Sequence, residues 1–265
     1  MSQPRLYMFQ CGVISQHWHD LMLGQRLGEP VDVPVPWYLV THTDGHTLVD
    51  GGNPAICAVD AHRHWGEIAD RCTPRMTPEQ ACTVELEAVG IAPADVRYIV
   101  QSHLHLDHTG ALSAIAAFPN ATVVATRAEF EYAHAPDWFS RALYVRADFT
   151  DPAIAWTLLE KHEDGYDVYG DGVVRLWQSP GHSPGHLAIE VTLAASGSIL
   201  LAVDAVATLH HWDERALPGF ATSHLEAVRS VRTLRRIAHR SQSTVVPGHD
   251  PDAWPTFKHS PHYYE

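Results

Sequence analysis

Four side chains that commonly bind metal ions lie within six residues, in the segment Ser102-His103-Leu104-His105-Leu106-Asp107-His108-Thr109-Gly110. In extended backbone, residues two apart point the same way, so His103 and His105 can hold one ion together. As the chain then turns, Asp107 and His108 are directed to the other side, where a second ion could bind. Clustered imidazole and carboxylate groups are costly to bury without partners, which favours a metal site over a chance surface cluster.

Three more residues of ligand type follow predicted strands further along the chain. His182 lies in the turn Pro180-Gly181-His182-Ser183-Pro184-Gly185-His186, whose glycines and prolines suit a tight turn that directs a side chain into a cleft. Asp204 ends an apolar run, where a carboxylate is paired or binds metal. His249 follows a short strand in the same way. Each histidine alone is more typical of a loop residue than of a ligand, but together they sit where α/β folds build sites.

The elements that must position these residues are strands interleaved with helices. Apolar runs bounded by turn residues predict strands over 37–40, 47–49, 96–100, 122–125, 173–177, 187–193, 199–203 and 244–246. The segment His42-Thr43-Asp44-Gly45 predicts a hairpin turn between the first two strands. The small residues 111–117 could begin a helix. This is the pattern of an α/β chain, and because no linker or short repeat divides it, we expect a single domain over residues 1–265.

Two capping boxes predict where helices begin. The first, Thr77-Pro78-Glu79-Gln80, has proline at the first helical position and predicts a helix that ends near Gly90. The second joins Ser223 to Glu226. The helix behind it should pack on the core through an apolar stripe, with its arginines solvated. The stripe is Leu225, Val228, Val231 and Leu234.

The composition is typical of a soluble globular protein and excludes several classes of function. There are 18 Lys and Arg against 31 Asp and Glu, a net charge of −13, so the chain lacks the positive field that binds nucleic acid or an anionic membrane. No signal peptide is evident, and the longest apolar run, 199–209, is too short to span a bilayer. The four scattered cysteines predict reduced thiols and, with the missing signal, a cytoplasmic location. Histidine, the commonest metal ligand, occurs 20 times.

The order H-x-H-x-D-H, then a distant His, an Asp and a further His, resembles the metallo-β-lactamase superfamily. More narrowly, nearly the whole chain resembles the bacterial N-acyl-homoserine lactone lactonases, which are quorum-quenching enzymes, and their γ-butyrolactone-cleaving relatives. The narrower likeness is carried by Val33-Pro34-Val35-Pro36, Asp50-Gly51-Gly52-Asn53, Ala135-Pro136-Asp137-Trp138-Phe139, Asp167-Val168-Tyr169-Gly170-Asp171-Gly172, Ala216-Leu217-Pro218-Gly219-Phe220 and Gly248-His249-Asp250-Pro251-Asp252-Ala253-Trp254.

This resemblance implies a four-layer αββα sandwich with two zinc ions per chain, or Co²⁺, Mn²⁺ or Fe²⁺ in their place. It implies a first metal held by His103, His105 and His182, a second held by Asp107, His108 and His249, and Asp204 as the bridge. All seven offer nitrogen or oxygen, which suits these divalent metals. Two such ions about 3.5–4 Å apart can share a hydroxide that attacks a lactone carbonyl. Asp107 is then the expected catalytic residue, which carries the proton to the leaving oxygen.

One position departs from the family pattern. Lactonases of this type commonly carry a tyrosine three residues after the bridging aspartate, where this chain has Ala207. His210 or His211 could substitute for its hydroxyl, the metals could suffice, or the preferred substrate could differ, so we assign neither histidine a role. We expect His17, His19, His62, His64 and His186 to be structural or exposed. Segments 16–22, 138–139 and 259–264 could line an acyl-chain channel or a dimer interface, although ordinary packing explains them as well.

Two other functions remain open from the sequence. A glyoxalase II-like thioesterase has the same ligand set, whereas a β-lactamase usually has cysteine at the bridging position and a nuclease would not be acidic. A non-catalytic protein could also keep the metals for stability, because bound metal favours the folded state. The resemblance also suggests a homodimer, and the expected partner is a small lactone.

Overall fold

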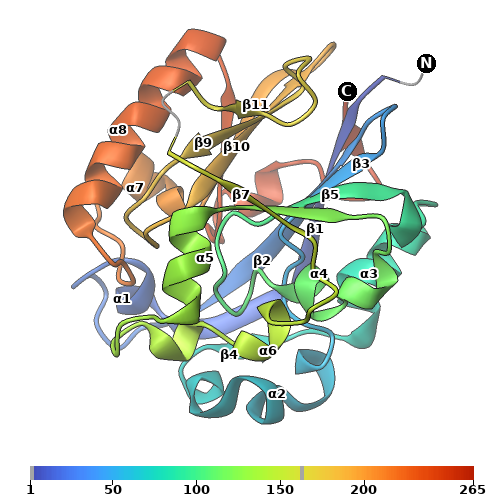
Figure 1. Cartoon of the computed structure of the whole chain (residues 1–265). Coiled ribbons are helices and arrows are strands. Elements are labelled where there is room, and N and C mark those ends of the chain that lie inside the picture. The colour runs from blue at the N-terminus through green and yellow to red at the C-terminus, as the bar shows by residue number, and fades with distance from the viewer. Residues whose placement is uncertain (1–2, 162–163) are drawn as a thin grey trace.

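The computed structural model describes residues 3–161 and 164–265, and its strands form two sheets (Figure 1). The first sheet has the order β13-β1-β2-β3-β5-β6-β7, with β4 paired to β1. Its strands are β1 (Arg5–His17), β2 (Pro30–Thr41), β3 (His46–Val49), β4 (Thr73–Arg75), β5 (Val96–Val100), β6 (Thr122–Thr126), β7 (Trp156–Leu159) and β13 (Tyr263–Tyr264). The second sheet has the order β12-β11-β10-β9-β8. Its strands are β8 (Tyr166–Asp167), β9 (Val174–Gln178), β10 (Leu187–Leu193), β11 (Gly197–Val203) and β12 (Thr244–Pro247).

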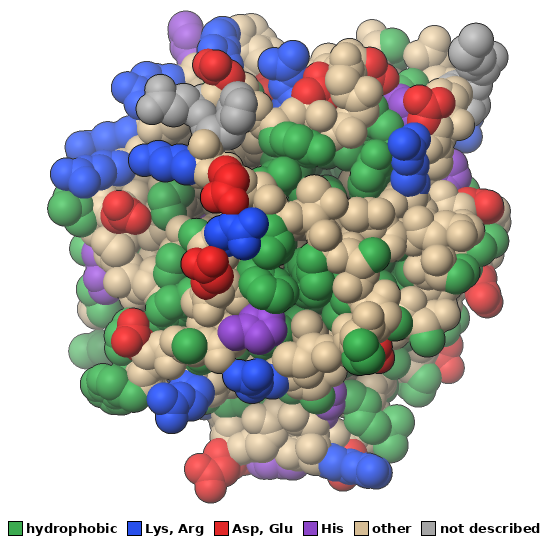
Figure 2. All heavy atoms as spheres, in the orientation of Figure 1, with side chains coloured by type: hydrophobic (Ala, Val, Ile, Leu, Met, Phe, Trp, Pro, Cys, Tyr) green, Lys and Arg blue, Asp and Glu red, His purple; other side chains and the backbone are tan. Residues whose placement is uncertain are grey.

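The helices lie on the outer faces of the two sheets. They are α1 (Trp18–Leu21), α2 (Cys57–Trp65), α3 (Cys82–Ala88), α4 (Gly110–Ser113), α5 (Arg127–His134), α6 (Arg146–Phe149), α7 (Leu209–Trp212) and α8 (His224–Ser241). Helix α8 covers the sheet of β9, β10 and β11, while α3 and α4 lie on the far side of the other sheet (Figure 1). Lys and Arg side chains gather on the outer surface over α8 (Figure 2).

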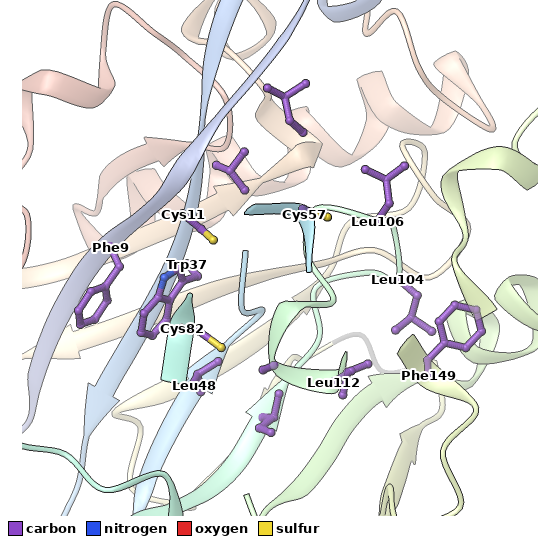
Figure 3. Packing of buried hydrophobic residues seen from close by; sticks show 14 of the residues in the cluster. Phe9, Cys11, Trp37, Leu48, Cys57, Cys82, Leu104, Leu106, Leu112 and Phe149 are labelled. Atoms are coloured by element: carbon purple, nitrogen blue, oxygen red, sulfur yellow. The ribbon is translucent and has the colours of Figure 1, made fainter. Parts of the chain in front are cut away.

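Strand β1 shows how the sequence directs side chains into different layers. Leu6 and Met8 are fully buried between the two sheets, whereas Tyr7 and Phe9 belong to the cluster between the first sheet and its helices. This alternation follows from the two-residue period of a strand. The outer cluster is tightly packed around Trp37, whose ring stacks on Phe9 with centroids 3.9 Å apart (Figure 3). The layers are therefore αββα, which confirms the expected fold.

All the predicted strands are present, and two of them, 96–100 and 187–193, have the predicted bounds. The expected hairpin also forms, because β2 and β3 pair antiparallel around residues 42–45. No helix in residues 3–161 and 164–265 has both the length and the apolar character needed to cross a membrane.

The two predicted helices differ in how well they form. The capping box at Thr77 exists, since Gln80 Oε1 accepts a hydrogen bond from Thr77 N at 2.9 Å. However, the prediction of one helix that runs to Gly90 is wrong. The chain makes a single 3₁₀ turn, is extended at Ala81 (ψ 140°), and only then begins helix α3.

Helix α8 begins as predicted, because Ser223 caps it by accepting a hydrogen bond from Glu226 N at 3.2 Å. The predicted core stripe is partly wrong, because Leu225 is 61% exposed. The face of α8 that contacts the sheet shares Val231 and Leu234 with the predicted stripe. It is rotated slightly about the helix axis, so small residues such as Ala227 and Ser230 are buried in place of Leu225. This face consists of Ala227, Ser230, Val231, Leu234, Ile237 and Ala238.

Candidate metal site

Strand ends from both sheets meet at one edge of the sandwich and carry all seven predicted ligands. The loop after β5 holds His103, His105, Asp107 and His108, while His182 follows β9. Asp204 directly follows β11, and His249 follows β12. All are buried except Asp107, whose side chain is 14% exposed.

The first group consists of His103, His105 and His182. One ring nitrogen from each lies within 4.8 Å of the others, and His105 Nδ1 is 2.9 Å from His182 Nε2. Three imidazole nitrogens this close together can hold a divalent transition metal.

The second group consists of Asp107, His108 and His249. The Asp107 carboxylate lies between the two rings, with Oδ1 3.7 Å from His108 Nε2 and Oδ2 3.6 Å from His249 Nε2. Six of the seven candidate ligands thus form two adjacent groups with the membership that the resemblance implies.

Asp204 lies between the two groups. Its Oδ2 is 3.2 Å from His182 Nε2, whereas its Oδ1 is 3.1 Å from His249 Nε2 and 3.5 Å from His108 Nε2. Each oxygen therefore faces a different group, as a bridging carboxylate must. The preceding residue, Val203, has φ 46°, which a β-branched side chain rarely adopts. This strain lies where the chain turns the carboxylate into the site.

A buried carboxylate, Asp50, orients ligands of both groups. It follows β3 and accepts hydrogen bonds from His108 Nδ1 (2.9 Å), Ser102 N (2.7 Å) and Ser102 Oγ (2.8 Å). Because Ser102 Oγ donates to Asp50, it accepts from His103 Nδ1 at 3.0 Å. Both imidazoles donate a hydrogen bond from Nδ1, which turns Nε2 of each ring toward the site. This role of Asp50 was not predicted from the sequence, although Asp50 follows a strand just as the candidate ligands do.

Backbone carbonyls fix two of the remaining rings. His249 Nδ1 donates to Pro34 O at 2.8 Å, and His182 Nδ1 donates to Phe220 O at 3.1 Å. His186 Nε2 accepts from Asp204 N at 3.2 Å. Burial lowers the pKa of His186 to about 3, so this ring is neutral and holds the backbone of Asp204 in place. It is structural, as expected.

The chemistry of these groups fits divalent metal ions. Within the described residues, His103 Nε2 and His108 Nε2 are buried and have no hydrogen-bond partner. Orphaned buried nitrogens are costly, and a bound cation would satisfy both. Burial opposes the charged form of His108, but nearby carboxylates, foremost that of Asp107, raise its pKa to about 10. The same negative potential attracts a metal cation.

Glycine allows the two loops of this centre to approach closely. A Cβ on Gly51 would lie 2.1 Å from Ala111 N, and one on Gly110 would lie 2.3 Å from Gly51 O. The loop that carries Asp50 therefore packs directly against the start of α4. Any larger residue at these positions would separate Asp50 from His108.

A cavity of about 560 Å³, counted to its open mouth, lies over the site. Its floor includes His105, His182, Asp204, His249 and Asp107, and its walls are largely apolar. The wall residues include Ile14, Gln16, Asp20, Leu21, Val33, Cys72, Leu143, Ala207, Pro218 and Phe220. Of the segments considered for a channel, only 16–22 contributes to this cavity.

Other predicted residues lie outside this cavity. Trp138 is 84% exposed, and the chain end forms β13 against β1. His211 is buried but bonds to Thr208 (Nδ1 to Oγ1, 2.9 Å), so neither it nor exposed His210 replaces the missing tyrosine hydroxyl.

A third group of ligand-type atoms, from His17, His19 and Asp20, also lies within 4.8 Å. Here the Arg71 guanidinium neutralises the carboxylate, and a cation would meet that positive charge.

The fold and this geometry match known proteins. The model of the metallo-β-lactamase superfamily matches residues 30–249, and the chain belongs to that superfamily. Among solved structures, an N-acyl homoserine lactone hydrolase with the product N-hexanoyl-L-homoserine at its catalytic metal center superposes with a TM-score of 0.87. That protein is 27% identical, and all of both chains is covered. Together with the His/Asp cluster, the fold implies a dinuclear metal centre.

Similar sequences identify one family within this superfamily. The N-acyl homoserine lactonase AttM of Azorhizobium caulinodans is 49% identical over 266 residues, with all of both chains covered. That of Agrobacterium fabrum is 48% identical over 265 residues, again with full coverage. The N-acyl homoserine lactonase of Bacillus cereus is 32% identical and covers 94% of each chain. Within the superfamily, the chain belongs to the N-acyl homoserine lactonase family.

Proposed function

We propose that this protein is a metal-dependent hydrolase that opens the lactone ring of N-acyl homoserine lactones or related γ-lactones. The observation that carries the proposal is the arrangement of the seven His and Asp side chains, in two groups around Asp204, on the floor of a largely apolar cavity. Its full-length relatives are N-acyl homoserine lactonases.

The two groups would hold two zinc ions, or Co²⁺, Mn²⁺ or Fe²⁺ in their place. The first ion would have His103, His105 and His182, the second would have Asp107, His108 and His249, and Asp204 would contact both. Imidazole and carboxylate ligands suit these metals. When bound, such ions lower the pKa of water to about 7 and polarise an ester carbonyl.

Asp107 would move the proton. Its carboxylate lines the cavity and accepts no hydrogen bond from the described residues, so one of its oxygens could meet substrate while the carboxylate also helps to hold the second ion. As water adds to the lactone carbonyl, an Asp107 oxygen takes a proton from it. When the ring C–O bond breaks, the same oxygen passes the proton to the leaving ring oxygen, which yields the open hydroxy acid.

The cavity walls would bind and orient the substrate. Leu21, Val33, Leu143 and Phe220 exclude water and offer apolar surface to an acyl chain. Ala207 lies in this wall and has no hydroxyl to donate to the carbonyl oxygen, so metal ions held by the seven residues would supply that stabilisation.

A cytoplasmic location fits the four cysteines, all of which are free and buried in the structure. The homodimer suggested by the resemblance stays a prediction.

The experiment combines metal analysis with ring-opening assays on purified protein. We expect about two metal ions per chain, opening of N-hexanoyl and N-decanoyl homoserine lactones, loss of activity on chelation, and recovery with Zn²⁺. His249→Ala should lose metal and activity, whereas His210→Ala, a change to an exposed histidine outside the cavity, should lose neither.

Three outcomes would contradict the proposal. Turnover of S-lactoylglutathione without any lactone would make the protein a thioesterase. Metal-loaded protein inactive on every substrate would make it a non-catalytic metal-binding protein. Full lactonase activity without metal would remove the cluster from the reaction.

A further inference from the structure

Asp20 places a carboxylate in the cavity wall, outside the cluster of seven ligands. It lies on α1 beside Leu21, and its side chain is 2% exposed. Pro218 and Phe220, also in this wall, are apolar. Because a buried carboxylate in apolar surroundings is costly unless it is partnered, the partners of its two oxygens indicate its role.

The first oxygen is fully used. Asp20 Oδ1 accepts from Arg71 Nε at 3.1 Å and also from Arg71 Nη2. The Arg71 guanidinium lies over the Phe220 ring, 4.7 Å from its centroid. Phe220 O in turn accepts the hydrogen bond from His182 Nδ1. Phe220 therefore ties the ion pair to the metal site and fixes the carboxylate relative to it.

The second oxygen accepts no hydrogen bond from the described part of the chain. His17 Nδ1 lies 3.9 Å from Asp20 Oδ2, which is within the range of an ion pair but too far for a hydrogen bond. Gln16 also lines the cavity, and its carboxamide donates to no described residue. The wall thus presents a fixed carboxylate, paired with Arg71 through Oδ1, whose Oδ2 accepts no hydrogen bond from a described residue.

We propose that Asp20 Oδ2 accepts the amide N–H of an N-acyl homoserine lactone and so selects these substrates over lactones without this donor. The inference rests on the proposed lactonase function. In a simple N-acyl homoserine lactone the amide N–H is the only hydrogen-bond donor, and every other polar atom is an acceptor. A carboxylate can therefore recognise nothing else on this substrate, and it repels an acceptor in the same place.

The test uses two substrates of one size. N-hexanoyl homoserine lactone carries the N–H, and α-hexanoyloxy-γ-butyrolactone has an ester oxygen instead. Ring opening of each is followed by chromatography with wild-type, Asp20→Asn and Asp20→Ala proteins. We expect wild-type kcat/KM to be about ten- to hundredfold higher for the amide, as for a hydrogen bond to a charged group. In both variants this ratio should fall to about one.

Arg71→Gln is the matched control, because it removes the ion pair but keeps the carboxylate. Because Arg71 fixes the carboxylate, this variant should lower the preference for the amide without abolishing it, with metal content unchanged. A merely structural Asp20 would instead make Asp20→Asn and Arg71→Gln slow both substrates alike.

Equal wild-type kcat/KM for the two lactones would overturn the inference, even if the variants did not fold. A preference that survives Asp20→Ala would overturn it as well. If the metal-loaded wild type opened neither lactone, the proposed function would fail and this inference with it. If it opened both equally, only the inference would fail.

Discussion

Glu129, on α5, joins the two loops that carry the first group of histidines. Its buried carboxylate accepts four hydrogen bonds: from Leu104 N (3.0 Å) and Tyr144 OH (3.3 Å) at Oε1, and from Ser183 Oγ (2.6 Å) and Gly185 N (3.1 Å) at Oε2. Burial raises the pKa of Glu129, but the four donors favour the ionised form. We predict that Glu129→Gln loosens both loops.

The magnitude follows from counting donors. Glutamine replaces one oxygen by NH₂, which in either orientation faces a backbone N–H, that of Leu104 or of Gly185. The Tyr144 or Ser183 hydroxyl on that side can rotate to accept, but the backbone N–H cannot. An unsatisfied buried donor costs about 1–3 kcal/mol, and loss of charge from the remaining bonds costs about 1 kcal/mol more. We expect the free energy of unfolding to fall by about 3 kcal/mol and Tm by roughly 6–12 °C.

Metal affinity should fall too. Leu104 lies between His103 and His105, and Gly185 lies in the loop of His182, so in either orientation of the amide one of the two loops loses a positioning contact. Loss of such an outer partner typically weakens metal binding about 10–100-fold. The assays are denaturant unfolding of the metal-free protein, followed by circular dichroism, and competition for metal with a chelating dye.

Glu131→Gln is the control on the same helix. Glu131 is exposed, and its Oε1 lies 3.9 Å from Arg127 Nη1, so the change should cost less than about 0.5 kcal/mol. If Glu129→Gln matched this control in stability and metal affinity, the reasoning would be refuted. If stability fell but metal affinity did not, Glu129 would support the fold without positioning the ligands.

Three further predictions follow from the site and its surroundings. Asp107→Asn should lower kcat about 10²–10⁴-fold while metal content by mass spectrometry is largely retained; full activity would exclude its role in proton transfer. Ala207→Tyr should change the rate for short-chain lactones, by up to about 100-fold upward if the hydroxyl reaches the oxyanion, and an unchanged rate would show that residue 207 does not face substrate. Burial raises the pKa of Glu85 to about 7 in the folded state. The folded protein therefore binds this proton more tightly than the unfolded chain does. The stabilisation that results is complete below a pH of about 4.5 and is lost as the pH rises through 7. Glu85→Gln, which keeps an acceptor for Trp37 Nε1, should stabilise the protein by about 1–2 kcal/mol at pH 8, after allowing for its partial exposure, and change little at pH 5. Urea unfolding at both pH values checks this, and equal effects at the two pH values would contradict it.

The strands and ligand types could be predicted because they depend on local patterns. The run 96–100 is apolar and is bounded by turn residues. In extended backbone, the two-residue spacing of His103 and His105 is enough to place both side chains on the same side. The predictions from the sequence were wrong where contacts with neighbouring elements determine the structure. Leu225 fits a helical stripe, but the angle at which α8 crosses the sheet leaves it in solvent. The break at Ala81 is another case, because the capping box beside it forms as predicted.

The residues that support the site could not be predicted for a related reason. Asp50 is 58 positions from His108, and Glu129 is 25 from Leu104. In the sequence, Glu129 looks like any charged residue on a surface helix. Only burial against two loops turns it into an acceptor for four donors.

By itself, the sequence determined which atoms could bind metal, which strands deliver them, and, through its resemblance, the family. Tertiary structure alone decided how those atoms are oriented: which imidazole nitrogen donates a hydrogen bond, which oxygen of Asp204 faces which group, and that Asp20 Oδ2 accepts no hydrogen bond from the described residues. The physical reason is that ligand type is a property of a residue, whereas tautomer, orientation and solvation depend on groups brought together from distant parts of the chain.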